Sequence, residues 1–115
     1  MTTKKGRDFE EKAVQSLSAL GLIVIERNIH TPYGEIDIVA LDGDTLCIVE
    51  VKGRTSPSEW DIDCIPRKKQ IRIAQSVEYF LMNNDSLPTF DELELCAFYW
   101  TKETPTFLRN AFDGL

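Results

Sequence analysis

Apolar residues recur along the first twenty positions with the period of a helix. Their spacings of four, four and three residues place them on one helical face: Phe9, Ala13, Leu17 and Leu20. Gly21 follows directly, and glycine is typical of the position just after a helix. The pattern therefore predicts an amphipathic helix over residues 5–20.

After Gly21 the pattern changes to that of β-strands. Residues 22–25 are apolar and predict a short strand, and a loop is expected around residues 32–34. Residues 35–41 and 45–52 predict two further strands. The Asp-Gly-Asp sequence at 42–44 between them is a strong hairpin signal.

A second helix is expected to begin near Pro66 and to run to about Asn83. Its apolar stripe is predicted to comprise Ile71, Ala74, Val77 and Leu81. Residues 93–100 predict a fourth strand, and the tail after it either adds an edge strand or simply packs Phe107 and Phe112. The order α-β-β-β-α-β predicts a single α/β domain with a central mixed sheet flanked by helices.

The hairpin over residues 35–52 has its ionisable groups at one end. Because alternate residues of a strand share a face, Glu50 and Lys52 point the same way. A two-residue turn, Asp42-Gly43 or Gly43-Asp44, places Asp37 opposite Ile48 or Glu50 respectively. Directly opposed residues share a face, so either register puts Asp37, Glu50 and Lys52 on one side.

The remaining positions of this hairpin are apolar on both faces. The side that carries the ionisable groups also carries Val39, Leu41, Leu46 and Ile48. The opposite side is expected to be core: Ile36, Ile38, Ala40, Cys47, Val49 and Val51.

Two carboxylates and an amine in such a half-buried place need partners or a metal ion. Carboxylate oxygens suit Mg²⁺, and a nearby lysine can stabilise developing charge or position an attacking water. The simpler interpretation is an amphipathic hairpin whose surface Asp37, Glu50 and Lys52 form a weak salt bridge. Face geometry alone favours neither interpretation.

Longer sequence motifs resemble a known family. GEID at 34–37, with EVK at 50–52, resembles the PD-(D/E)XK nuclease signature. The whole string GEIDIVALDGDTLCIVEVKGRT resembles the YraN family, which is related to archaeal Holliday-junction resolvases and restriction endonucleases. GRDFE at 6–10, KQIR at 69–72 and NAF at 110–112 extend the resemblance over nearly the whole chain.

The resemblance implies a restriction-endonuclease-like fold and a metal-dependent endonuclease that hydrolyses DNA phosphodiester bonds, at branched or structured DNA. The implied catalytic residues are Asp37, Glu50, Lys52 and Gln70. The implied ligands of Mg²⁺, for which Mn²⁺ can substitute, are Glu10, Asp37 and Glu50. From the residues alone, solvated helix positions are the favoured interpretation of Glu10 and Gln70. Glu35 is either a further acidic neighbour or a strand-end residue paired with Lys52 or Arg54.

Two features depart from the family pattern. Phe9 stands where the family usually has glycine, and the loop from Thr55 to Cys64 lacks the usual Phe-Gly-x-Pro. Substrate contacts from this loop are therefore not implied. Trp60 within it either anchors the loop or stacks on a base, and no role is assigned to His30.

Net charge is −6, which counts against tight binding to nucleic acid. Most of the excess lies after residue 72, where two basic and seven acidic residues occur. The predicted nucleic-acid contacts are the basic residues before that point, near Gln70: Arg54, Arg67, Lys68, Lys69 and Arg72. A solvated helix face is the commoner interpretation of such a run.

The three cysteines, Cys47, Cys64 and Cys96, are far apart and lie among apolar residues, which predicts buried, reduced thiols in a cytoplasmic protein. No apolar run approaches the ~18 residues of a membrane span, and the basic N-terminus does not lead into an apolar stretch. A homodimer is expected only by analogy with branched-DNA resolvases.

Three functional hypotheses follow. The first is a DNA endonuclease. The second is a nuclease-fold module that binds nucleic acid or a protein partner without cutting, and the acidic balance favours it. In the third, metal binding serves stability alone.

Overall fold

The computed structural model describes residues 4–54 and 66–112. Its elements are α1 (Lys4–Ala19), β1 (Ile23–Thr31), β2 (Gly34–Asp42), β3 (Thr45–Arg54), α2 (Arg67–Met82), β4 (Glu92–Thr101) and β5 (Thr104–Leu108). The predicted order α-β-β-β-α-β is confirmed. The tail adds β5 as an edge strand, which was one of its two predicted fates.

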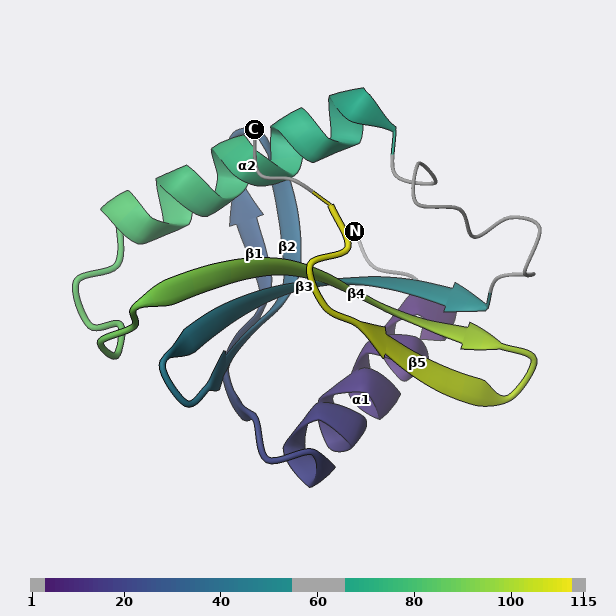
Figure 1. Ribbon diagram of the computed structural model, residues 1–115. Helices are drawn as coiled ribbons and strands as arrows, with labels where there is room; N and C mark the ends of the chain where they lie inside the picture. The colour runs from purple at the N-terminus through teal and green to yellow at the C-terminus, as the bar shows by residue number, and fades with distance from the viewer. Residues whose placement is uncertain (1–3, 55–65, 113–115) are drawn as a thin grey trace.

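The strands form one mixed sheet in the order β1-β2-β3-β4-β5. Neighbours are antiparallel except β3 and β4, which run parallel. The helices cover opposite faces, with α2 above the sheet and α1 below it in Figure 1. In the described ranges, neither helix combines the length and the apolar character needed to cross a bilayer.

The end of α1 is set by Gly21, as its sequence position predicted. The Leu22 N–H bonds to the Leu17 carbonyl and the Gly21 N–H to the Ser18 carbonyl, at 3.0 Å each. Gly21 has a φ of +93°, the left-handed conformation that this type of C-cap requires. Leu20 lies in this turn and is 63% exposed, so its predicted place on the core-facing stripe was wrong.

The β2–β3 turn consists of Gly43 and Asp44, since Asp42 pairs with Thr45. Of the two registers that the sequence allowed, the structure thus has the one that continues toward Asp37 opposite Glu50. Gly43 takes a φ of +59°, which glycine adopts without steric cost at the first position of a hairpin turn.

Both faces of this hairpin are core, because a helix covers each of them. The cluster beneath α1 includes Ile38, Ala40 and Val49, and the cluster beneath α2 includes Val39 and Ile48. Coverage by both helices explains why the sequence of the hairpin is apolar on both faces. Ile36 packs in the α2 cluster and not, as predicted, with Ile38, so regular alternation breaks down around Asp37.

The predicted length of β1 was wrong, and the predicted stripe of α2 was only partly right, since Val77 is buried and Leu81 packs against the core. β1 extends to Thr31 instead of ending near residue 25, because it follows β2 along most of its length. The buried side of α2 comprises Ile73, Ser76, Val77 and Phe80, whereas Ile71 is exposed. The apolar residues of α2 allow two overlapping stripes, and the one containing Phe80 fills the core.

Candidate functional site

The candidate site lies at the fork, which is the place beside Asp37 and Val51 where β2 and β3 separate. Their register pairs Ile38 with Val49, and no further pair is formed toward the start of β2. In the opening, the Asp37 carboxylate accepts a hydrogen bond from the Val51 N–H, at 2.8 Å. The Asp37 side chain thus binds a backbone N–H of β3 at the place where the hydrogen-bonded pairing of β2 with β3 ends.

Negative charge accumulates around Asp37. Burial and the charges of Glu50 and Glu10 raise the pKa of Asp37 to about 8, against the opposing effects of the Val51 hydrogen bond and of Lys69. Burial is the largest cause of this rise in pKa, and the negative charge of Glu50 is the next. The charge of Glu50 therefore acts on the Asp37 carboxyl. That Asp37, Glu50 and Lys52 share one face of the hairpin stays a prediction.

Glu10 reaches this site from α1. It is only 4% exposed, so the solvated helix position favoured by the residues alone was wrong. Burial is the main cause that raises the pKa of Glu10, followed by the charge of Glu35. The charge of Arg27 opposes the rise most, followed by the side-chain hydrogen bonds with Asn28 and with Asp37.

The N-terminal half of α1 is held in place by Phe9. A Cβ on Gly53 would lie 3.3 Å from the Phe9 ring, so the ring covers the backbone of β3 directly. The same ring packs against Trp100, with ring centroids 4.9 Å apart. Phe9, one of the two departures from the family pattern, thus fixes the turn of α1 that carries Glu10.

Glu50 is buried and pairs with Lys69 of α2, whose Nζ lies 2.5 Å from Oε1 of Glu50. From the sequence, Lys69 was predicted only as a nucleic-acid contact. No sequence signal marked it as a partner of Glu50, because the distance between α2 and the end of β3 depends on the fold.

Lys52 lies in a β-bulge. Val51 pairs with Phe98 and Gly53 with Tyr99, which leaves Lys52 as an extra residue on β3. Bulges re-aim side chains and are frequent beside active sites. Lys52 is half-buried, and its catalytic role remains a prediction.

Gln70 and Glu35 are two further residues that the sequence analysis singled out. Gln70 is half-buried in the first turn of α2, directly after Lys69, and its role also remains a prediction. Glu35 is an acidic neighbour of Glu10, and its Oε1 lies 3.7 Å from Nε2 of His30.

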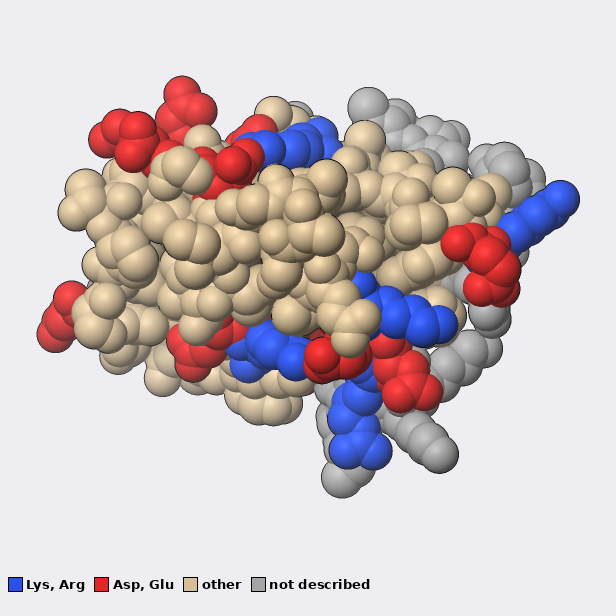
Figure 2. Space-filling model, turned by 90° about the horizontal axis from the view of Figure 1, so that it is seen from below, with Lys and Arg blue, Asp and Glu red and all other residues tan. Residues whose placement is uncertain are grey.

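The predicted nucleic-acid contacts are spread over two elements. Arg67, Lys68 and Arg72 are exposed on α2. Arg54 is the last residue of β3, with its side chain outside what the structure describes, and so is the Thr55–Cys64 loop with Trp60. From the α1 side, Lys and Arg lie beside Asp and Glu and form no continuous basic area (Figure 2).

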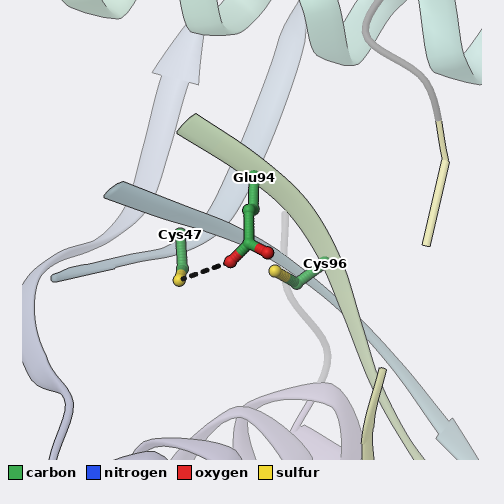
Figure 3. Close-up of side chains that lie close together, drawn as sticks. All are labelled: Cys47, Glu94 and Cys96. Carbon is green, nitrogen blue, oxygen red and sulfur yellow. Dashed lines mark hydrogen bonds between the residues drawn. The ribbon is translucent and has the colours of Figure 1, made fainter. Parts of the chain in front are cut away.

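A second group of potential ligands lies on the α1 face, away from the fork. Among the described residues, Cys47, Glu94 and Cys96 are the one set whose donor atoms all lie within 4.8 Å of one another (Figure 3). Both cysteines are buried free thiols, as predicted, and Cys64 lies outside the described residues. Their wide sequence spacing gave no sign that β3 and β4 bring them together.

Arg109 already binds two members of this group, Glu94 and Cys47. Its guanidinium pairs with Glu94 and Asp42, and Nη2 also donates to the Cys47 sulfur at 3.7 Å. Asn110 binds the other oxygen of Glu94 at 2.8 Å. Glu94 thus has its counter-ion in Arg109, and the group forms a structural network.

The fold and the fork define an α/β domain with a buried acidic site that is assembled from both sides of a mixed sheet. The chain belongs to the uncharacterised protein family UPF0102, whose model matches residues 9–98. The resemblance to YraN proteins, which the motifs indicated, is thereby confirmed.

Curated relatives agree over most of the chain. A UPF0102 protein of Colwellia psychrerythraea is 37% identical over 96% of this chain and 90% of its own length. One from Nitrobacter winogradskyi is 35% identical over 95% of this chain and 92% of its own. One from Persephonella marina is 37% identical over 70% and 71%, respectively. These names state no activity.

Proposed function

We propose that this protein is a Mg²⁺-dependent endonuclease that hydrolyses phosphodiester bonds in DNA. The observation that carries the proposal is the position of Asp37 in the fork between β2 and β3, between a buried glutamate from α1 and another from β3. Three acidic side chains from three elements are costly to bury together unless a cation neutralises them.

The donors present fit Mg²⁺. Glu10, Asp37 and Glu50 offer carboxylate oxygens, the hard ligands that this ion prefers. Burial and the charges of Glu50 and Glu10 raise the pKa of Asp37, so a divalent cation would offset the cost of ionising this carboxyl. The oxygens of all three do not lie within 4.8 Å of one another. We therefore assign Asp37 and Glu50 as ligands and Glu10 as a ligand either directly or through water.

The remaining residues have distinct roles in the proposed reaction. When bound, Mg²⁺ supplies Lewis-acid polarisation and positive charge for the scissile phosphate. Lys52 stabilises charge that develops on the phosphate, and Gln70 orients the attacking water. Arg67, Lys68 and Arg72 neutralise neighbouring phosphates and hold the DNA in register.

The alternative is a nuclease-fold module that binds nucleic acid or a protein partner without cutting. It is favoured by the net charge of −6 and by the mixed charges on the face in Figure 2. The two functions differ in whether DNA strands are broken, which a direct assay decides.

Cleavage is tested with labelled branched, duplex and single-stranded DNA and with RNA, each incubated with Mg²⁺ or Mn²⁺. The endonuclease cuts at least one DNA with either ion and none in EDTA. Asp37→Asn, Glu50→Gln and Lys52→Met abolish cutting, whereas the control Glu78→Gln, an exposed acid on α2, leaves it unchanged. No cutting of any substrate would contradict the proposal.

Binding is tested separately with EDTA and with Ca²⁺, which neutralises the site without cleavage. For the wild type, affinity for the DNA rises with Ca²⁺, and Glu50→Ala removes that gain. The dependence of DNA affinity on salt is shallow, because only about four to six phosphates are neutralised. Each of them contributes roughly −0.9 to the slope of log K against log salt concentration. Equal affinities of wild type and Glu50→Ala, each with EDTA and with Ca²⁺, would show that nucleic acid does not bind at the fork. The partner-binding module would then be favoured.

A further inference from the structure

Asn28 of β1 lies across from the candidate site. β1 and β2 pair Arg27 with Ile38 and Ile29 with Ile36, so Asn28 stands between these pairs, opposite Asp37. Asn28 therefore borders the fork from the strand on the other side of β2.

The backbone of Asn28 has a φ of +50°. This left-handed conformation is uncommon for residues other than glycine, although asparagine tolerates it better than most. In the middle of a strand, such a conformation redirects the side chain out of regular alternation. Local strain of this kind is retained when the surrounding structure depends on it.

The redirected side chain meets Glu10. In the amide orientation that satisfies hydrogen bonding, Nδ2 of Asn28 donates to both carboxylate oxygens of Glu10, at 2.8 and 3.1 Å. Neighbouring Arg27 forms an ion pair with Glu11, with 2.8 Å between Nη1 and Oε2, although its charge also acts on Glu10. Asn28 thus binds a buried carboxylate whose other side-chain hydrogen bond is to Asp37.

We propose that Asn28 is a positioning residue, which fixes the rotamer of Glu10 so that its carboxylate is directed at the fork for a divalent cation. The inference rests on the proposed function, because it assigns Glu10 to the same metal site. Without the Asn28 amide, Glu10 loses two hydrogen bonds and its fixed direction, so cation affinity falls while the fold remains.

Substitution by glycine separates the effect of losing the Asn28 side chain from the effect of backbone strain at this position. Asn28→Gly deletes the amide and accepts a φ of +50° freely, whereas Asn28→Ala deletes the amide and adds steric strain. Asn110 offers a matched control, because it has the same φ of +50° and its Nδ2 also donates to a glutamate, Glu94, far from the fork.

Mn²⁺ affinity, measured by titration of the free ion, and thermal melting in EDTA are compared for wild type, Asn28→Gly, Asn28→Ala and Asn110→Gly. We expect Mn²⁺ binding to weaken about tenfold in both Asn28 variants, as for other partners that orient metal ligands. Asn28→Gly melts slightly lower than wild type, because the buried Glu10 carboxylate loses two donors. Asn28→Ala melts lower still, and Asn110→Gly keeps wild-type Mn²⁺ affinity.

Wild-type Mn²⁺ affinity in Asn28→Gly would overturn the inference and leave the proposed function standing. A melting temperature that falls without a change in Mn²⁺ affinity would also overturn it, since the role would then be structural. If the wild type itself does not bind Mn²⁺, the proposed function fails, and this inference fails with it.

Discussion

Lys69 and Glu50 form an ion pair across the interface of α2 and β3, with 2.5 Å between Nζ and Oε1. The glutamate is buried, whereas the Lys69 side chain is 42% exposed. The Lys69 ammonium is therefore an exchangeable counter-ion of Glu50, a carboxylate that is proposed to bind Mg²⁺. It can leave Glu50 for a phosphate when a metal ion takes over the charge.

Lys69→Ala is expected to tighten Mn²⁺ binding in the absence of DNA, because the competing ammonium is removed. The gain is about two- to fivefold, since a partly exposed ion pair is worth at most about 1 kcal/mol. Lys68→Ala removes the same charge from an exposed position and should leave Mn²⁺ affinity unchanged. Isothermal titration of both variants is the measurement, and identical behaviour would contradict competition at Glu50.

The contribution of Asp37 to the stability of the metal-free protein is expected to decrease as the pH rises from about 4 to about 8. Asp37 has a folded-state pKa of about 8 against an ordinary value of 3.8, so its stabilising contribution is complete below about 4 and is lost as the pH rises through the folded value. Asp37→Asn cannot ionise and should melt several degrees above wild type at pH 8.5 in EDTA.

That difference in melting temperature should shrink toward pH 5. The exposed Asp91→Asn provides the control and should follow wild type at every pH. Saturating Mg²⁺ should also reduce the difference, because it compensates the charges of Asp37, Glu50 and Glu10. A constant gap between wild type and Asp37→Asn from pH 5 to 8.5 would refute the raised pKa.

Gly53→Ala is expected to destabilise the fold by about 1–3 kcal/mol. Gly53 combines a φ of +76° with a Phe9 ring 3.3 Å from the new methyl group. Gly21→Ala meets a similar backbone cost at φ +93° but faces open space, so it should cost less. Urea unfolding gives both values, and equal losses would mean that Phe9 yields freely to the methyl group.

Arg109→Met should destabilise the protein by about 1–3 kcal/mol, because Glu94 is left in a largely buried place without its counter-ion. The double variant Arg109→Met with Glu94→Gln should recover part of that loss, since no charge then remains unpaired. Urea unfolding of both single variants and the double variant completes the cycle. Strictly additive losses would show that the two side chains are not coupled.

The order of elements and the register of the β2–β3 hairpin could be predicted because local patterns determine them. The Asp-Gly-Asp turn allows only two registers, and adjacent antiparallel strands need no long-range information. The extent of β1 was missed because its polar residues 26–28 carry no strand pattern, and only pairing with β2 forms the strand.

The rest of the site depends on packing between distant elements. The burial of Glu10 follows from how Phe9 packs on Gly53, and the pair of Lys69 with Glu50 follows from where α2 crosses the sheet. Asn28 had no signal beyond the tolerance of asparagine for positive φ. The break in alternation at Asp37 was hidden, because Ile36 and Ile38 are both buried and differ only in the helix that covers them.

The parallel pairing of β3 with β4 also sets the order in which the chain can fold. β1, β2 and β3 are sequential antiparallel neighbours and can assemble early from local contacts. β4 joins β3 only after the long segment between them, including α2, has closed over the sheet. Until then the apolar central strand is an open edge, able to pair with another chain. Refolding yield should therefore fall with protein concentration, and docking of β4 should be the step that covers this edge.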